Sequence, residues 1–278
     1  MKTSPAAAGG GGRPAIESRR AFLQVLAGAA AGLCLGALRP PPAAGFGTMR
    51  PADHGPAVKR FAFAQLRHGG ADWEPHPSAV GEFVRELERM TSVEAAPERV
   101  DLPAGDPRLF SHPFLCLRGV REFPAFSEAE VGRLRTWIEA GGTLLVDDAA
   151  GTPGYGFDAA ARRELARILP ESRPARLGSD HTVFKSFFLV RTVSGARIAS
   201  PFLEGITLQG RTAVILSANN LLGAYARDPL GRWVDPCAPG GERQRRLAFH
   251  LGVNIVLYAL CSDYKQDRIH VSFLRQRS

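Results

Sequence analysis

Apolar side chains recur along this chain in two patterns that take turns. Spacings of three and four residues predict amphipathic helices, and short uninterrupted apolar runs predict buried strands. The predicted strands span residues 61–66, 113–119, 143–146 and 212–217, with a shorter extended piece near 100–102. The predicted helices span residues 78–91, 127–140, about 158–169 and about 242–260. The stretch between residues 170 and 211 is less regular.

Polar residues mark where two of these helices start and stop. Ser78 is placed to cap the first helix. Ser127 and Glu130 form a capping box, in which each side chain accepts a backbone N–H of the other residue. Gly141 ends that second helix, because glycine readily adopts the left-handed conformation that follows a helix.

Strands that alternate with helices and lack a two-residue period predict a parallel sheet covered on both faces. The sequence therefore predicts an α/β domain over residues 58–262, after a Pro/Gly-rich linker at 46–57 and before a C-terminal tail at 263–278. Ligands of such sheets bind beyond the carboxyl ends of the strands.

Polar side chains follow four of the predicted strands at this end. The candidates for ligand binding or loop support are His68, Asp72, Arg118, Asp147, Asp148, Asn219 and Asn220. Asp147 and Asp148 are adjacent, so their side chains should point to opposite sides of the sheet. We expect one to face a ligand while the other accepts hydrogen bonds from its loop. The alternative is that either carboxylate only secures a turn.

Three of the polar residues could also support catalysis. Asp148, His181 and His68 could serve as bases, or as ligands of a divalent cation in a metal-assisted hydrolase. Asp180 precedes His181 and could orient its imidazole, although such a pair also occurs as a buried strut. The spacing commits to no metal site.

Two further features allow binding roles. Trp73 follows a pair of glycines and could stack on a ring, but the phosphate-binding glycine motifs are absent, so no nucleotide or other cofactor is predicted. Tyr225 and Trp233 flank residues 227–232, which predict an exposed hairpin-like loop. Packing over the strand ends is the alternative for these two aromatic residues.

The first 45 residues lie outside the predicted domain. The stretch SRRAFLQ closely resembles the twin-arginine export motif, with Gln24 where lysine is usual. The apolar run at residues 25–38 is shorter than a membrane-spanning helix needs. The resemblance implies export of the folded protein to the bacterial periplasm by the twin-arginine machinery, with the signal either cleaved or kept as an anchor.

Removing this segment lowers the positive charge. Residues 1–45 hold five of the 35 basic and one of the 27 acidic residues, which leaves 30 and 26 and a net charge of about +4. That balance does not favour nucleic-acid binding. Cys116 is expected inside a strand, and Cys237 and Cys261 could pair in an oxidising compartment.

Five blocks carry a resemblance to a known family. PFLCLRG, SEAEVGRLRTWIEAGGTLLVDD, SDHTVF, SANNLLGAYARD and HLGVNIVLYAL resemble, in order, family 4159 of the bacterial domains of unknown function, over about residues 59–262. The family looks like a branch of the class I glutamine-amidotransferase-like superfamily, which implies a flavodoxin-like three-layer sandwich. The enzymes of that superfamily use a cysteine on a sharp turn. Cys116 lacks such a turn, so we expect a core thiol and no amidotransferase activity.

Two functional hypotheses follow. The first is a non-catalytic module of a cell-envelope system that binds a small ligand or a partner protein. The second is a periplasmic hydrolase that uses aspartate and histidine at the sheet edge. If the His181 ring lies within about 3 Å of a strand-end carboxylate, the hydrolase hypothesis is favoured.

Overall fold

A computed structural model of the protein describes residues 60–275, with side chains up to Cys261. The predicted export signal and linker therefore lie outside the described residues. Within the described part, no helix combines the length and the apolar character that crossing a bilayer requires.

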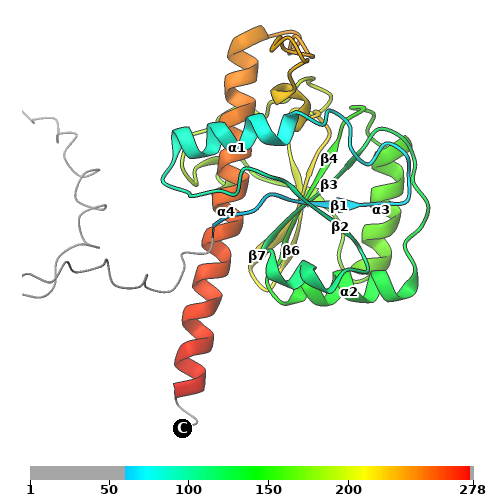
Figure 1. Ribbon diagram of the computed structural model, residues 1–278. Coiled ribbons are helices and arrows are strands. Elements are labelled where there is room, and N and C mark those ends of the chain that lie inside the picture. Colours follow the sequence, from blue (N-terminus) through cyan, green and yellow to red (C-terminus); the bar gives the residue numbers. More distant parts are fainter. Residues whose placement is uncertain (1–59, 276–278) are drawn as a thin grey trace, which may run out of the picture. The chain divides into compact units, whose positions relative to one another are not determined.

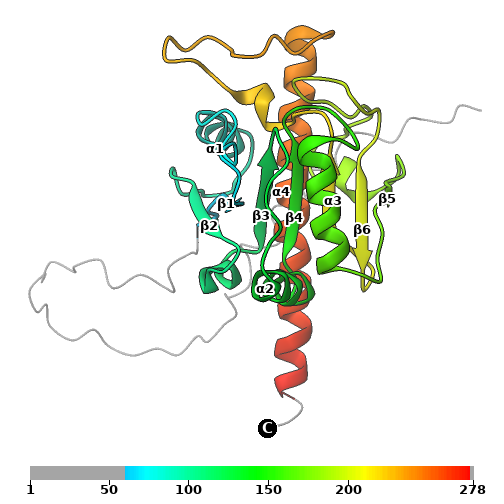
Figure 2. The same ribbon diagram turned by 90° about the vertical axis from the view of Figure 1, so that its right-hand side faces the viewer.

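Seven strands form one mixed sheet. Their order is β2 (Val100–Pro103), β1 (Ala64–Arg67), β3 (Phe114–Gly119), β4 (Thr143–Asp148), β7 (Arg211–Ser217), β6 (Glu204–Leu208) and β5 (Ala175–Arg176). The first five are parallel, while β6 and β5 run antiparallel to their neighbours. Figure 2 shows the parallel strands ending at one edge, which we call the carboxyl edge. The α/β prediction is confirmed, and the arrangement is consistent with a flavodoxin-like sandwich.

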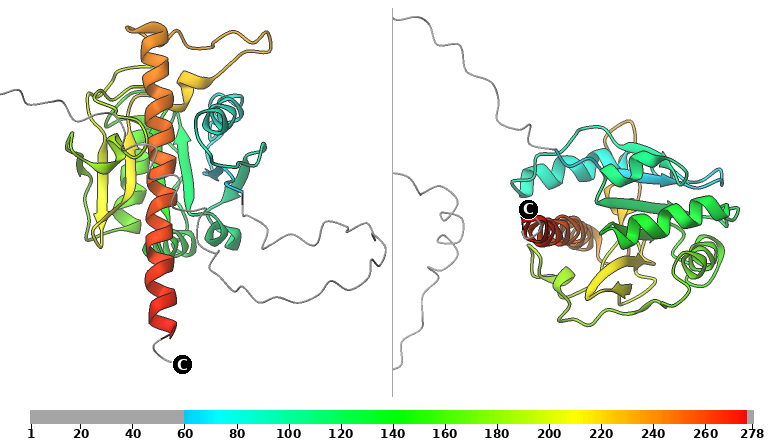
Figure 3. Two further views of the ribbon diagram at one scale, coloured as in Figure 1. Left: turned by 90° about the vertical axis from the view of Figure 1, so that its left-hand side faces the viewer. Right: turned by 90° about the horizontal axis from the view of Figure 1, so that it is seen from below.

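Helices cover both faces of the sheet, as Figures 1 and 3 show. The helices α1 (Ala79–Met90) and α4 (Gly241–Arg275) pack on one face. The helices α2 (Glu128–Glu139) and α3 (Gly156–Ile168) pack on the other. Three short 3₁₀ helices complete the fold: η1 (Pro107–Ser111), η2 (Thr182–Phe184) and η3 (Leu222–Tyr225).

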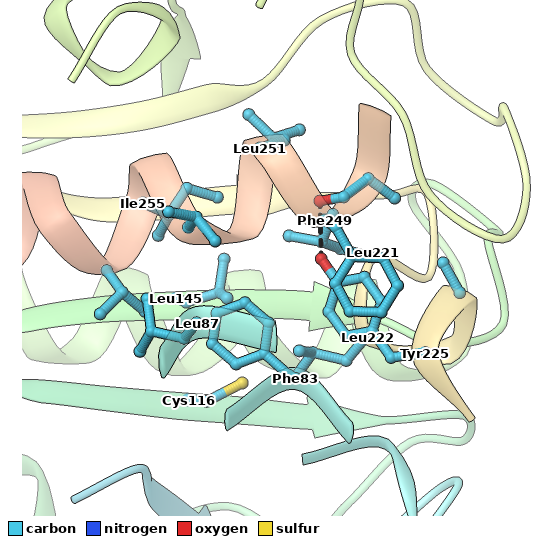
Figure 4. Packing of buried hydrophobic residues seen from close by; sticks show 14 of the residues in the cluster. Phe83, Leu87, Cys116, Leu145, Leu221, Leu222, Tyr225, Phe249, Leu251 and Ile255 are labelled. Carbon is cyan, nitrogen blue, oxygen red and sulfur yellow. Dashed lines mark hydrogen bonds between the residues drawn. The ribbon is translucent and has the colours of Figure 1, made fainter. Parts of the chain in front are cut away.

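Alternation along the strands divides the core into two apolar clusters. Cys116 and Leu145 point toward α1 and α4, whereas the adjacent Leu115 and Leu144 point toward α2 and α3. Figure 4 shows the first cluster, where the Tyr225 hydroxyl donates to the Ala248 carbonyl at 2.7 Å. Full burial of each large aliphatic side chain contributes about 1.5–3 kcal/mol, so these two clusters hold the layers together.

Of the two predicted helix caps, one is present in the structure and the other is not. The Ser127–Glu130 capping box is present at the start of α2. Ser78 does not cap α1, so that prediction is wrong: its backbone is already helical, and its hydroxyl instead donates to the Arg227 carbonyl at 2.7 Å. Ser78 therefore ties α1 to the loop that follows η3.

Two parts of the chain are more regular than predicted. The irregular stretch after α3 contains β5, η2 and β6. The last helix, predicted to end near Leu260, continues to Arg275. Strand β5 has only two residues, and β6 is interrupted by a register shift at Ile206/Thr207, which explains why neither shows a clear period.

Cys237 and Cys261 are both free. Cys237 precedes α4, and Cys261 lies 20 residues beyond the start of that helix at Gly241, which corresponds to about 30 Å of helix. A disulfide requires Cα atoms within about 7 Å, so the two cysteines of one chain cannot pair.

Candidate functional site

Asp147, at the end of β4, anchors the loop that follows β7. Its carboxylate accepts the backbone N–H groups of Leu221 at 2.7 Å and Leu222 at 3.0 Å. The side chain is fully buried, and burial raises its pKa, against the opposing effects of the Arg118 charge and the two amides. A buried carboxylate that accepts two amides and faces a cation is a loop anchor with no free oxygen to offer a ligand.

Arg118, at the end of β3, joins three segments of the carboxyl edge. Its guanidinium donates to the Pro75 carbonyl at 2.9 Å and to Asn220 Oδ1 at 3.4 Å, and lies 3.6 Å from Asp147 Oδ2. The side chain is buried, and its Nε has no hydrogen-bond partner among the described residues. Buried arginines of this kind are retained only where several acceptors surround them.

His76 lies next to this cluster and was not predicted from the sequence. Its Nε2 is 3.5 Å from Asn220 Nδ2. Both residues have positive φ angles, 60° for His76 and 49° for Asn220, a backbone conformation that residues with a side chain rarely adopt. Burial lowers the pKa of His76, and the Arg118 charge lowers it further. A neutral imidazole therefore packs over the buried ion pair.

Asp148 points to the opposite side of the sheet, as the alternation predicts. Its carboxylate accepts the N–H of Ala150 at 2.9 Å and of Thr152 at 2.7 Å. Burial raises its pKa while these two amides lower it. We expected one of the adjacent aspartates to face a ligand, but both secure loops: Asp147 holds the β7 loop and Asp148 holds its own.

His68, at the end of β1, lies on the same side as Asp148. Its Nδ1 accepts from the Gly70 N–H at 3.1 Å, so its Nε2 carries the proton and donates to the Arg118 carbonyl at 3.1 Å. The ring stacks on Phe123 with centroids 4.4 Å apart. Burial lowers the pKa of this histidine. Both ring nitrogens are thus engaged by the backbone.

Asp72 joins the loops after β1 and β3, where the strand order switches sides. Its Oδ2 accepts the N–H groups of Val120 at 2.7 Å and Arg121 at 2.5 Å. Two consecutive amides of this kind form an anion-binding site, and here the chain fills it with its own carboxylate. Asp72 therefore ties the two loops together at the switch point.

Trp73 has cationic partners on its ring. The guanidinium carbons of Arg67 and Arg99 lie 4.8 and 5.4 Å from the ring centroid. The expected stacking surface therefore receives arginines of the same chain. The ring of Trp233, which flanks the predicted hairpin-like loop, likewise has the Arg227 guanidinium carbon 3.5 Å from its centroid.

Asn219 holds the segment that crosses behind β7. Its Oδ1 accepts from the N–H groups of Ala199 at 2.8 Å and Ser200 at 2.7 Å, and its Nδ2 donates to the Ser200 carbonyl at 2.8 Å. Through these three bonds the Asn219 side chain satisfies backbone groups of Ala199 and Ser200, as a neighbouring strand would.

His181 lies at the opposite end of the sheet from Asp148. Its Nε2 is 2.9 Å from Thr212 Oγ1, and its Nδ1 accepts from the Val183 N–H at 3.1 Å. Thr212 is the second residue of β7 and lies five residues before Ser217, which pairs with Asp147. Five residues of strand span about 16 Å, so His181 and Asp148 do not meet.

Asp180 does not orient the His181 ring. Both ring nitrogens of His181 already have partners, and Asp180 is exposed. Burial lowers the pKa of His181, and the nearby charge of Asp180 opposes that shift. The histidine instead caps the short helix η2 through its Nδ1.

Cys116 is a core thiol, as predicted. It is fully buried in the cluster of Figure 4, and burial raises its pKa far above the ordinary value. A thiol held protonated in an apolar core is not a nucleophile. Within residues 60–261, no three His, Cys, Asp or Glu side chains are grouped so that they could hold a metal ion.

The polar residues of the carboxyl edge thus form two groups, one on each side of the sheet. Arg118, Asp147, Asn220 and His76 lie on the α1/α4 side, and His68 and Asp148 on the α2/α3 side. Sequence spacing could not reveal His76, because its loop, flanked by Pro75 and Pro77, has no periodicity. What the arrangement does chemically is fix loops.

A comparison with curated proteins finds none that matches the chain. Residues 62–260 match the family described as Domain of unknown function (DUF4159). This match covers most of the chain and all strands of the sheet, so the protein belongs to that family.

Proposed function

We propose that this protein is an exported, non-catalytic module of the bacterial cell envelope that binds a partner protein through the loops of its carboxyl edge. The similarity of SRRAFLQ to twin-arginine signals supports export. We further propose that its fold is related to that of the glutamine-amidotransferase-like superfamily, without the activity of those enzymes.

One observation supports the binding role: the carboxylates of the carboxyl edge hydrogen-bond to the backbone of the loops. Asp72, Asp147 and Asp148 each accept two N–H groups. Such bonds fix the loops in one conformation before any partner arrives, and preorganised loops lower the entropic cost of binding. Both oxygens of Asp147 and of Asp148 accept such bonds, whereas a catalytic base or nucleophile needs an atom that can reach the substrate.

The fixed loops present exposed apolar and cationic side chains. The surface, which we call the loop patch, consists of Val120, Arg121, Tyr155, Arg197 and Ile198. Tyr155 is 76% exposed, and Val120 and Ile198 are also exposed. Exposed aromatic residues and arginines are the residue types that contribute most to protein interfaces.

Hydrogen bonds join the three loops of this patch. The Ala149 N–H donates to the Gly119 carbonyl at 3.0 Å, which ties the β4 loop to the β3 loop. Arg197 Nη1 donates to the Ala150 carbonyl at 3.0 Å, which ties the third loop to the β4 loop. The patch therefore behaves as one surface.

Charge indicates the kind of partner. The side chains of Arg121 and Arg197 are exposed, and neither forms an ion pair with a carboxylate of the described residues. An interface favours opposite charge on the partner. The partner surface that fits combines apolar side chains with carboxylates.

Site-specific photo-crosslinking in the cell envelope tests this role. A benzophenone amino acid at position 155 should give a discrete adduct, which Arg121→Glu removes. The same amino acid at Gln209, exposed in the turn between β6 and β7 at the other edge, is the matched control. No adduct at 155, or equal adducts at 155 and 209, would contradict the proposal.

Export is tested separately. Changing Arg19 and Arg20 to lysine should leave the protein in the cytoplasm, because the twin-arginine machinery requires the arginine pair that the motif supplies. Fractionation with a periplasmic marker measures this. Unchanged export of the double-lysine variant would contradict the twin-arginine assignment and leave the binding role to stand alone.

A further inference from the structure

A cavity of about 250 Å³ opens at the carboxyl end of β7, between α3 and the segment that leads into β6. Leu216 and Ala218, at the end of β7, form part of its lining. Here the sheet changes from parallel to antiparallel, because β7 pairs in parallel with β4 and antiparallel with β6. The crevice beyond strand ends is where α/β sheets bind small molecules.

Asp158 gives this cavity a free carboxylate oxygen. The side chain is only 3% exposed, and its Oδ2 accepts from the Gly154 N–H at 2.6 Å and from Arg162 Nε at 2.8 Å. Its Oδ1 accepts no hydrogen bond from the described residues, and this oxygen keeps some contact with solvent. Asp158 lines the cavity, and Oδ1 is its one carboxylate oxygen without a partner among the described residues. A carboxylate oxygen so nearly buried needs a donor.

Three charged side chains line the cavity, and Arg176, the cross-strand neighbour of Glu204, places a further guanidinium near its wall. Arg162 bonds both Asp158 and Glu204, and all three residues line the space. Two carboxylates and one guanidinium leave a formal charge of −1. A partly enclosed site strengthens the attraction of that charge for a cation relative to open water.

Apolar groups form much of the remaining wall. Pro153, Pro201 and Phe202 contribute rigid surface, and the Phe202 ring already has a cation near it, the Arg176 guanidinium, 5.0 Å from the centroid. Phe202 therefore already has a cationic partner, and together with the two prolines it offers a ligand apolar surface. The lining thus suits a molecule with a positive group and a short carbon skeleton.

We propose that this cavity binds a small primary amine, with the ammonium group on Asp158 Oδ1 and the carbon skeleton against Pro153 and Phe202. A volume of about 250 Å³ lies below the roughly 300–1,000 Å³ typical of drug-sized ligands, which restricts the ligand to about the size of an amino sugar or smaller. The lining of this site shares no residue with the loop patch, although Ala199 directly follows Ile198, and the proposal does not depend on the proposed partner.

Two pairs of probes that differ in charge test the proposal. Ethanolamine is compared with ethylene glycol, and glucosamine with glucose, at pH 7 by NMR titration of the folded protein. We expect saturable shifts of the Pro153–Arg162 and Ala199–Glu204 resonances with the amines, at least tenfold weaker binding with the uncharged probes, and no dependence on the loop-patch variant Arg121→Glu.

Three variants assign the binding to this cavity. Asp158→Asn should weaken amine binding at least tenfold. Ala199→Leu fills the cavity without changing charge and should abolish it, so the proposal stays testable even if Asp158→Asn loosens its loop. Glu171→Gln, the same neutralisation at a separate cavity of about 420 Å³ near the end of α3, should change nothing.

Three outcomes would overturn the proposal. One is the absence of saturable shifts with either amine. Another is equal binding of charged and uncharged probes. The third is an effect of Glu171→Gln equal to that of Asp158→Asn in variants that keep the wild-type Tm.

Discussion

Arg118 Nη2 and Asp147 Oδ2 lie 3.6 Å apart in the interior of the protein, with their side chains 1% and 0% exposed. Each also bonds to a loop: Asp147 to the amides after β7, and Arg118 to the Pro75 carbonyl after β1. This pair connects the carboxyl ends of β3 and β4 to the loops that follow the two flanking strands, β1 and β7. Its purpose in the fold is to set the positions of those loops.

Loss of one partner should therefore be costly. We expect Asp147→Ala to lower the free energy of unfolding by about 3–5 kcal/mol, because it leaves the Arg118 charge buried without its carboxylate. Urea denaturation measures this. Asp180→Ala, an exposed carboxylate, is the control and should change stability by less than about 0.5 kcal/mol. If Asp147→Ala behaves like the control, the pair does not hold the fold.

His181 should behave as a structural residue. His181→Ala removes the cap of η2 and the contact with Thr212, and we expect a loss of about 1–2 kcal/mol in stability. Crosslinking from position 155 should be unchanged in this variant, because His181 lies at the other end of the sheet. If His181→Ala loses the crosslinked adduct from position 155 but keeps the wild-type Tm, His181 contributes to partner binding.

Stability should fall as the solution becomes acidic. The pKa of His68 is lowered from 6.5, so its folded form resists protonation. A group with a lowered folded pKa contributes stability that is present above the unfolded pKa and lost as pH falls through the folded pKa. We expect the free energy of unfolding to decrease from pH 7 toward pH 5, and His68→Gln to reduce that decrease.

The raised pKa values of Asp147 and Asp148 act in the opposite direction, since their contribution grows as pH falls. The difference between wild type and His68→Gln isolates the histidine from these aspartates. An identical pH profile for the two proteins would contradict the neutral, doubly bonded imidazole described for His68.

Thiol reactivity separates the three cysteines of the domain. Cys116 and Cys237 are buried, and burial raises the pKa of both, whereas Cys261 is exposed. In a folded chain that begins after residue 45, a thiol reagent should modify one cysteine quickly and all three after denaturation. Cys261→Ser should remove the fast reaction. Fast modification of Cys116 would contradict its place in the core.

The sequence predicted the layers of this fold well and the roles of its polar residues poorly. Apolar periodicity is dictated by burial, so β3, β4, β7 and the four helices could be recognised. The short strand β5 and the shifted strand β6 were missed because neither has a sustained period.

The roles of the polar side chains depend on hydrogen-bond partners whose positions in space cannot be read from the sequence. Asp147 and Asp148 were correctly expected to point to opposite sides, but their acceptor roles required the positions of the Leu221 and Ala150 amides. His181 was grouped with Asp148 by residue type, although the irregular stretch carries it to the far end of β7. The family's superfamily relationship and the export of this chain stay predictions.

Asp72, Asp147 and Asp148 at the carboxyl edge each hold a loop by accepting two backbone N–H groups. Residue-resolved hydrogen exchange by NMR tests this role most directly. The amides of Val120, Arg121, Ala150, Thr152, Leu221 and Leu222 should be protected, and Asp72→Ala, Asp148→Ala and Asp147→Ala should each release only the two amides that bond to the missing carboxylate. If these amides exchange freely in the wild-type protein and the variants change nothing, the carboxylates do not hold the loops.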